Sequence, residues 1–429
     1  MTNSPSNPRN FSSPNDDDLT RKDSLFKDNL AQRHRRGIVW KVIFQISTVI
    51  GIIALSTLLI KILNDTMGYA AIEYKKDPST ISSSGLPLDE MTCSELRVIL
   101  AENVTKNRLR TIEREKPMVE RSQSECLDLV ISEVAEPTVK KTWPLFASLF
   151  NYEEIQSIAA EEYPGGDLIF KVWLSRAFIL SPQSDDPLKA GIRTAILGSI
   201  YIIIIVIIFA FPIGVAAAVY LEEYASQSRI NQIIQTNINN LAGVPSIIYG
   251  MLGLALFVRY LEPLTSGAIF GSADPTTANG RTILSAGLTL ALLILPVVII
   301  NGQESIRAVP NSLRQASYGM GATKWQTVWS HVLPNALPGI LTGTILAVSR
   351  AFGETAPLVV VGAATFITFD PEGIFSKFTS VPIQIYQWTA RPQDAFRNIA
   401  AAAIIVLLVL LLLLNAAAVF LRNRYSRRW

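Results

Sequence analysis

Long apolar runs alternate along the chain with polar stretches, and this pattern predicts membrane-spanning helices. A helix that crosses the hydrocarbon core of a bilayer needs about 20 residues with few charges. The runs that approach or exceed this length are residues 37–63, 191–220, 236–260, 283–300, 336–361 and 398–421. The stretches 261–280 and 365–393 between them are expected to form loops or short re-entrant turns. The predicted fold class is therefore an all-α membrane protein with six transmembrane helices.

Composition agrees with this class, and the basic residues predict a topology. Hydrophobic residues make up 49% of the chain and charged residues only 17%, while the mean hydropathy is +0.31. The net charge of +3 is too small to indicate a nucleic-acid partner. Basic residues cluster at 33–36, before the first run, and at 422–428, after the last run. Because positive residues favour the cytoplasmic side, both termini are predicted to be cytoplasmic, and an even number of spans agrees.

Two longer segments of the chain, residues 1–36 and 64–188, are not part of any predicted span. Residues 1–36 are rich in Ser, Asn, Pro and Asp, which predicts a disordered cytoplasmic tail. Residues 64–188 are polar and contain no spanning run, so they are expected to form an extracytoplasmic insert between helices 1 and 2. Helices are expected in this insert over 92–115 and 118–136, so it is partly helical. The remaining residues, 189–429, form the predicted five-helix core.

The two cysteines of the chain, Cys93 and Cys126, both lie in this insert. A compartment outside the cytoplasm can be oxidising, which favours a disulfide. In a straight antiparallel hairpin about Pro117, however, a rise of about 1.5 Å per residue would leave the two cysteines roughly 20 Å apart. A bridge therefore requires a break in the first helix, near Asn103 or Asn107. The sequence leaves a disulfide and two free thiols equally open.

A polar, amphipathic segment at 313–334 separates the fourth and fifth apolar runs. It is too polar to cross a bilayer and too short to form a domain. Its pattern predicts a helix, a bend at Gly319 and Gly321, and a second helix that begins at Lys324. Leu333-Pro334 is expected to close the segment, because proline restricts the residue before it.

This segment resembles the signature loop of ABC importer permeases, in which a Glu-Ala-Ala triplet precedes a glycine and a later Leu-Pro. The triplet falls here on Gln315-Ala316-Ser317, where Gln315 replaces an acid and Ser317 replaces an alanine; His331 replaces an aliphatic residue. The amphipathic shape persists. The resemblance implies a cytoplasmic coupling loop, residues 303–334, that docks into a groove of a separate ATPase. The residues assigned to this contact are Gln315, Ala316, Ser317, Gly321, Lys324, Leu333 and Pro334.

The run from Arg350 to Pro357, Arg-Ala-Phe-Gly-Glu-Thr-Ala-Pro, narrows the resemblance. Together with the loop it is similar to the PstA-type permeases of bacterial phosphate importers, over roughly residues 193–424. This resemblance implies a type I importer permease of the MetI-like class, located in the bacterial inner membrane among lipids, which forms half of a translocation path. The partners that it implies are a sister permease, a pair of ATP-binding subunits, an extracytoplasmic phosphate-binding protein and phosphate.

Arg350 and Glu354 are charged residues within the fifth apolar run, one helical turn apart. An ionised group at the centre of a bilayer costs on the order of 3 kcal/mol, so both are expected to face the bundle interior. One interpretation is a self-neutralising pair, although Arg before Glu is the weaker order. The other, which the family resemblance favours, is a substrate path. Arg350 would offer its forked cation to an oxyanion, Glu354 would hold it, and Thr355 would add a hydroxyl donor.

The sequence contains no motif of nucleotide binding, nucleophilic catalysis or zinc-dependent hydrolysis. It contains no Gly-x-x-x-x-Gly-Lys-Ser/Thr loop for ATP, no nucleophile elbow and no His-Glu-x-x-His motif. Only two histidines are present, without metal-ligand spacing, so neither a metal nor a cofactor is predicted. The chain is therefore predicted to be a transport subunit and not an enzyme, with ATP hydrolysis on a separate subunit. The alternatives are a permease for another oxyanion, such as sulfate or molybdate, and a membrane-anchored scaffold without a transport role.

Overall fold

The structure of the protein, a computed structural model, describes residues 30–81, 87–226, 228–271, 280–363 and 366–425. It divides into two units, residues 1–61 and 62–429, which are described separately. The first unit contains α2 (Leu30–Asp65), whose last turn belongs to the second unit. α2 includes the predicted first span and is apolar enough to cross a membrane. Residues 1–29 of the predicted disordered tail lie outside the described residues, and the rest of that tail is already helical.

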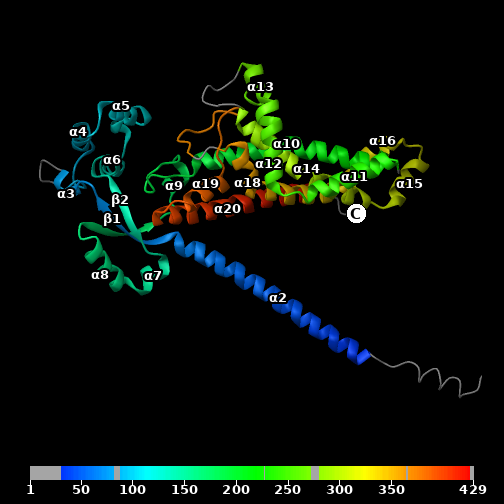
Figure 1. Cartoon of the computed structure of the whole chain (residues 1–429), viewed down its shortest axis with the longest axis horizontal. Helices are drawn as coiled ribbons and strands as arrows, with labels where there is room; N and C mark the ends of the chain where they lie inside the picture. Colours follow the sequence, from blue (N-terminus) through cyan, green and yellow to red (C-terminus); the bar gives the residue numbers. More distant parts are fainter. Residues whose placement is uncertain (1–29, 82–86, 227, 272–279, 364–365, 426–429) are drawn as a thin grey trace, which may run out of the picture. The chain divides into compact units, whose positions relative to one another are not determined.

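The second unit contains a bundle of long helices (Figure 1). They are α10 (Arg193–Val219), α14 (Ile283–Arg307), α17 (Leu333–Gly353) and α20 (Asp394–Tyr425). α14 packs against both α10 and α17 and is the most buried of them. Gly287 of α14 makes this packing close, because a Cβ at this position would collide with Ile205 of α10. The core between these helices is apolar and includes Ile202, Leu290 and Ile294. The predicted helical membrane core is thereby confirmed.

The third predicted span, 236–260, is not one straight helix. The chain forms α11 (Arg229–Ala242) and then α12 (Ser246–Gly253), which continues as a π-helix over Leu254–Tyr260; the two parts are bent by 107°. Pro245 at the bend has no amide hydrogen, and it disfavours helical geometry for the residue before it. Among the described residues, five helices are long and apolar enough to cross a membrane, or six if the bent pair is one span.

The fifth predicted span, 336–361, is also interrupted. α17 ends at Gly353, and α18 (Ala356–Val361) begins after Thr355. The cause of the break is Pro357, because a continuous helix would need an amide hydrogen from this residue to bond to the carbonyl oxygen of Gly353.

Short helices occupy the connections that were expected to be loops or re-entrant turns. α13 (Glu262–Thr265) and a 3-10 turn at Ala268–Phe270 follow the bent pair. α19 (Val381–Thr389) packs against α20, and its Trp388 is fully buried. Such short elements carry too few residues for a reliable periodic pattern, so it is tertiary packing that places them.

The insert contains an antiparallel sheet that the sequence did not predict. The strand order is β2-β1-β3, formed by β1 (Met67–Tyr74), β2 (Pro137–Thr142) and β3 (Gly166–Val172). Ala70 of the central strand pairs with Thr142 on one side and with Ile169 on the other. The paired strands are distant in the sequence, so no local sequence pattern predicts the sheet. The helices of the insert are α3 (Pro78–Ile81), α4 (Cys93–Asn103), α5 (Lys106–Glu115), α6 (Gln123–Val130), α7 (Leu145–Phe150), α8 (Tyr152–Glu162) and α9 (Arg176–Leu180), with a 3-10 turn at Met118–Glu120 and a π-helical turn at Ile131–Ala135.

The two cysteines of the insert form a disulfide, Cys93–Cys126, with their Cα atoms 5.6 Å apart. The continuous helix expected over 92–115 is wrong, because the chain breaks between α4 and α5. This break, just after Asn103, removes the geometric obstacle that a straight hairpin would present. The helices close over a small core that includes Leu96, Leu100 and Val130.

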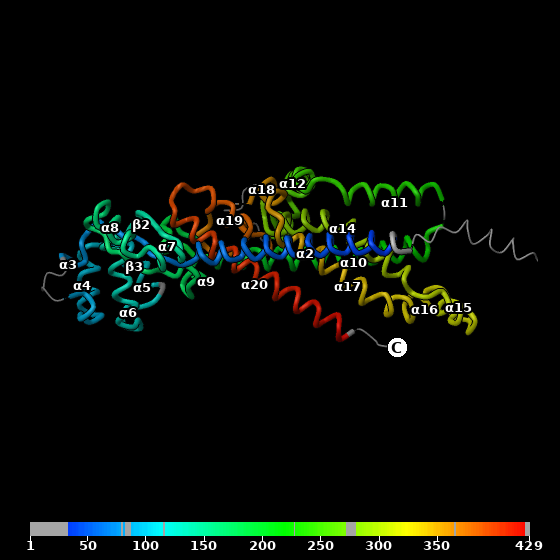
Figure 2. Tube along the Cα trace, turned by 90° about the horizontal axis from the view of Figure 1, so that it is seen from below, coloured from blue at the N-terminus to red at the C-terminus, as the bar shows by residue number. Residues whose placement is uncertain are grey.

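The insert and the segment 311–332 lie at opposite ends of the bundle. Figures 1 and 2 both show β2, α7 and α9 at one end and α15 (Asn311–Gly319) and α16 (Lys324–Thr327) at the other. A helix rises about 1.5 Å per residue, so α10 and α20 are each long enough to span the hydrocarbon core. A membrane crossed by these helices would therefore separate the two segments.

Candidate functional site

The predicted helix, glycine bend and second helix of the segment 313–334 are present. α15 ends at Gly319, and Gly321 then adopts a φ of +82°, a conformation that favours glycine. α16 begins at Lys324, and the Thr323 hydroxyl accepts a hydrogen bond from the backbone amide of Gln326.

The expected closure of this segment at Leu333-Pro334 is wrong. The helix that begins at Lys324 runs on to Gly353 and includes these two residues. A π-helical turn over Val328–Val332 precedes the proline and accommodates its missing amide hydrogen. A force on α16 would therefore act directly on a helix that enters the bundle.

A buried ion pair fixes α15 to the end of α10. Arg314 Nη2 lies 2.7 Å from Glu223 Oε1, and the Arg314 and Glu223 side chains are only 14% and 7% exposed. The same guanidinium donates hydrogen bonds to the carbonyl oxygens of Val309 (2.7 Å) and Ile306 (3.0 Å). Sequence reasoning missed this pair, although Glu222 and Glu223 after one apolar run and two arginines after another were visible.

The two helices of the segment are also joined to each other. The hydroxyl oxygens of Ser317 and Thr327 lie 2.8 Å apart, and both side chains are buried. The Ala322 amide donates to the Ser317 carbonyl oxygen, which closes the turn. Ser317 therefore braces the loop from inside and does not face outward, unlike its neighbours Gln315 and Ala316.

The outer side of this segment is an exposed apolar surface. Met320 is 89% exposed, while Trp325 and Trp329 are each 59% exposed and stack with ring centroids 5.4 Å apart. We call these three residues the coupling surface. Lys324 lies at its edge with Nζ 5.2 Å from the ring centroid of Tyr224. Of the other predicted residues, Gly321 is exposed, whereas Leu333 and Pro334 are half-buried in the continuing helix.

Arg350, Glu354 and Thr355 lie at the break between α17 and α18. Arg350 Nε lies 3.5 Å from Glu354 Oε1, and their side chains are 54% and 17% exposed. Arg350 occupies the last turn of α17, Glu354 is the residue at which helical geometry ends, and Thr355 directly precedes α18. The pair is long and partly open, so the guanidinium remains accessible to an anion. Within this chain Glu354 is largely enclosed, whereas Arg350 is about half exposed.

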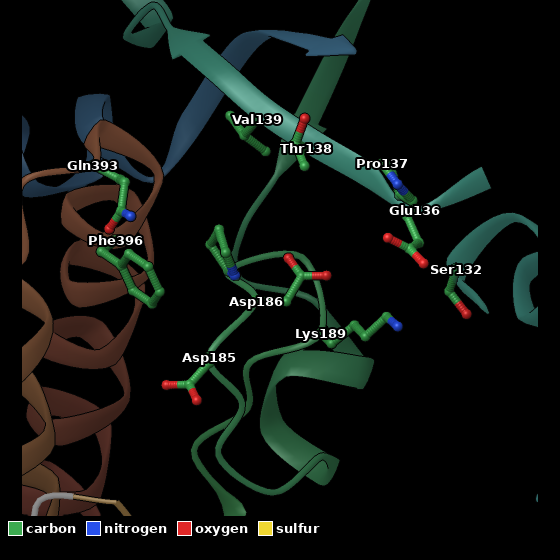
Figure 3. A pocket seen from close by; sticks show the side chains of 11 residues that line it. Ser132, Glu136, Pro137, Thr138, Val139, Asp185, Asp186, Lys189, Gln393 and Phe396 are labelled. Carbon is green, nitrogen blue, oxygen red and sulfur yellow. The ribbon is translucent and has the colours of Figure 1, made fainter. Parts of the chain in front are cut away.

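A cavity of about 500 Å³ lies at the base of the insert (Figure 3). Glu136, Thr138 and Val139 line it from the sheet side, and Asp185, Asp186 and Lys189 line it from the loop before α10, while Gln393 and Phe396 contribute from the start of α20.

Two of the acids that line this cavity form ion pairs. Asp185 bonds to Arg391 at 2.9 Å, and Glu136 bonds to Lys75 at 2.7 Å. Asp186, the third acid that lines the cavity, accepts a 2.9 Å hydrogen bond from the Leu188 amide.

Glu133 is the acid that holds this region to the helical part of the insert. It accepts two hydrogen bonds from Arg108, both 3.0 Å, and lies 3.2 Å from Lys189. The hydrogen bonds from Arg108, followed by the attraction of Lys189, hold the pKa of Glu133 below its ordinary value of 4.5, against the opposing effect of burial. Among the described residues, no group of three metal-ligating side chains could hold an ion.

Comparison with known proteins decides the family. Residues 210–427, about half of the chain, match the model of the binding-protein-dependent transport system inner membrane component. The chain belongs to this family. This inner membrane component is therefore a multi-pass membrane protein, as the apolar runs predicted.

Several relatives of this inner membrane component carry descriptive names. A phosphate transport system permease protein PstA of Haemophilus influenzae is 34% identical over 213 residues, which are 49% of this chain and 68% of the relative. A PstA of Mycobacterium leprae is 37% identical over 212 residues, 49% of this chain and 63% of that protein. A probable ABC transporter permease protein, YqgI of Bacillus subtilis, is 33% identical over 192 residues, 45% and 60% of the two chains. The match thus spans about 60% of the length of this Bacillus relative.

Solved structures of transport proteins are more distant. The MetNI methionine ABC transporter in an inward-facing conformation is 18% identical, with a TM-score of 0.41 over 54% of this chain and 94% of that chain. A bacterial ABC transporter for the acidic polysaccharide alginate is 16% identical, with a TM-score of 0.39 over 75% of this chain and 100% of that chain.

Proposed function

We propose that the chain is the permease subunit of an ATP-driven phosphate importer and forms half of its translocation path. The observation that carries this proposal is the braced segment 311–332, whose exposed apolar surface continues without a break into a bundle helix. Membership of the inner membrane component family supports a transport role, and the PstA relatives support phosphate as the substrate.

The proposed task of the coupling surface is to receive a separate ATPase subunit. A surface of stacked tryptophans and an exposed methionine suits a protein groove, because aromatic and methionine side chains are enriched in such contacts. The contacts of Arg314 and Ser317 hold the segment rigid. Because the segment is rigid, a movement of the ATPase would tilt α17 and would not merely deform the loop. Gln315 and Lys324 would add polar contacts at the rim.

The proposed substrate contact is Arg350. A guanidinium offers donors in a fork that matches two oxygens of a phosphate. Its 3.5 Å separation from Glu354 and its 54% exposure leave these donors available. Glu354 would keep the cation in place between transport events, and Thr355 would add a hydroxyl donor. A sister permease would enclose the site from the open side.

We further propose that both termini and the coupling segment are cytoplasmic and that the insert is extracytoplasmic. The arginines near the C-terminus favour the cytoplasmic side. In this arrangement a pair of ATP-binding subunits contacts the coupling surface, while an extracytoplasmic phosphate-binding protein delivers phosphate on the side of the insert.

The test is phosphate-dependent ATPase activity and phosphate uptake of the reconstituted complex, with Arg350→Ala against the wild type. We expect Arg350→Ala to abolish stimulation while basal ATP hydrolysis and assembly remain. The matched control is Arg397→Ala, because Arg397 is also an exposed arginine beside an acid, 3.6 Å from Asp394 in the first turn of α20. Equal stimulation in wild type and Arg350→Ala would end the proposed role of Arg350.

Two further measurements separate the proposal from its alternatives. Competition of labelled phosphate uptake by sulfate or molybdate distinguishes a phosphate permease from one for another oxyanion. A single cysteine introduced by Met320→Cys should crosslink to the ATPase subunit, whereas Val119→Cys in the insert, which is 91% exposed, should not. A crosslink from Val119→Cys alone would place the ATPase on the wrong side and refute the transport mechanism.

A further inference from the structure

Hydrogen bonds join the last residue of α2, the start of α20 and strand β2 at the end of the bundle that carries the insert. The side-chain amide of Asn398, near the start of α20, donates a 2.7 Å hydrogen bond to the carbonyl oxygen of Asp65, the last residue of α2. The side chain of Thr142 in β2 donates to Asn398 Oδ1 at 2.9 Å. Because α2 and α20 are both apolar enough to span a membrane, a membrane that both helices cross would end near this junction on the side of the insert.

The short helix α7 is attached at this same boundary. The amide of Phe146 donates a 2.7 Å hydrogen bond to Oδ1 of Asn64, in the last turn of α2. On its inner side, the Ser148 hydroxyl oxygen accepts a 3.0 Å hydrogen bond from the Tyr69 amide of β1. Ser148 itself is only 3% exposed. Figures 1 and 2 both show α7 beside the point where α2 continues into β1.

The other side of α7 is apolar and uncovered. Phe146 is 49% exposed, Leu149 is 64% exposed and Phe150 is 82% exposed. Their spacing of three and four residues places them on one face of the helix. The helix, Leu-Phe-Ala-Ser-Leu-Phe, contains no charged residue. Large apolar side chains at such exposure are unfavourable in water but favourable at the boundary of the acyl chains.

The residues around α7 match the composition of a membrane interface. Tyr69 packs with both Tyr152 and Phe170, with ring centroids 5.3 Å apart in each case. Lys141 lies 5.6 Å from the ring centroid of Trp143. Aromatic residues with a polar end gather where the hydrocarbon core meets water.

We propose that Phe146, Leu149 and Phe150 insert into the bilayer at its boundary on the side of the insert and hold the sheet against the membrane surface. The occupant of this face is lipid, because α7 is bonded to the last turn of a helix that is apolar enough to span a membrane, and its exposed side is apolar and uncharged. This role is independent of which solute the permease carries. It positions β1, and with it the cavity of Figure 3, at a fixed height above the membrane.

The test uses the full chain in lipid nanodiscs with a nitroxide label on a single new cysteine. The two native cysteines are bridged, so the label reacts only with the residue introduced by Phe150→Cys. At 82% exposure, this substitution removes no packing contact on which folding depends. The matched control is Val119→Cys, which is 91% exposed on another part of the insert.

Collision rates of the label with oxygen, which concentrates in lipid, and with a water-soluble nickel complex are then compared. We expect the ratio of oxygen to nickel accessibility to exceed one for Phe150→Cys and to fall below one for Val119→Cys. Equal ratios at both positions would overturn the proposal. So would a label at Phe150→Cys that is water-accessible in the nanodisc and becomes protected only when the soluble binding protein is added, because the face would then belong to a protein partner.

Discussion

The sharpest quantitative prediction concerns the buried ion pair that holds the coupling surface to the bundle. Arg314→Ala removes the only cation within bonding distance of Glu223 among the described residues, and it leaves a carboxylate that is 7% exposed. The neighbouring pair, Arg307–Glu222, has a similar separation of 2.9 Å but a side-chain exposure of 67% for the arginine. Arg307→Ala is therefore a control of matched chemistry and different burial.

The magnitudes follow from burial. Removing one partner of a buried ion pair costs about 3–5 kcal/mol, because the remaining charge loses compensation in a region of low polarity. The residual exposure of Arg314 and Glu223 favours the lower end of that range, about 3 kcal/mol. In the Arg307–Glu222 pair the glutamate is 19% exposed but the arginine lies in solvent, and a pair that solvent screens contributes about 0–1 kcal/mol. Since every 1.4 kcal/mol is a factor of ten, Arg314→Ala should increase local opening of the segment about 100-fold.

Hydrogen–deuterium exchange of the full chain in nanodiscs, without ATPase subunits, measures this opening at the amides of residues 308–327. Exchange there should accelerate strongly in Arg314→Ala, hardly at all in Arg307→Ala, and less in the double variant Arg314→Ala, Glu223→Ala, which buries no lone charge. If the two single variants accelerate exchange equally, burial of the Arg314–Glu223 pair does not stabilise the segment and the reasoning is refuted.

Three further predictions concern the rest of the chain. Cys93→Ser opens a loop of 33 residues and should lower the free energy of unfolding of the insert by about 3.7 kcal/mol, measured by proteolysis under oxidising conditions; an unchanged cleavage rate would contradict it. Gly198→Ala, whose Cβ would collide with the Thr379 carbonyl oxygen, should destabilise the bundle by about 1–3 kcal/mol in a melting assay, whereas Gly353→Ala meets no atom within 4 Å and should be close to neutral. Glu133→Gln should cost about 1 kcal/mol at pH 7. Because the folded-state pKa of Glu133 is lowered, its contribution is present above pH 4.5 and is lost as the pH falls through the folded-state pKa, so the melting curves of wild type and variant should converge in acid; a constant difference would count against the assignment.

The sequence by itself determined the class of the protein and the place of the polar segment 313–334. Apolar runs such as 283–300 are local signals, because lipid imposes a length on any helix that crosses it. The bend at Gly321 was equally local, since a positive φ suits glycine wherever it occurs. These features needed no knowledge of which residues meet in space.

Only the tertiary structure decided where the predicted helices are interrupted and which distant residues contact each other. A proline can interrupt any helix, but the tertiary structure decided that spans are bent or interrupted at Pro245 and Pro357 and that a helix continues through Pro334. The Arg314–Glu223 pair joins residues 91 positions apart. The sheet of the insert likewise depends on pairing between distant strands. Local sequence patterns determine which helices can form. Long-range contacts determine where a helix is interrupted and which residues pair, because these contacts stabilise the chain only after distant segments have come together.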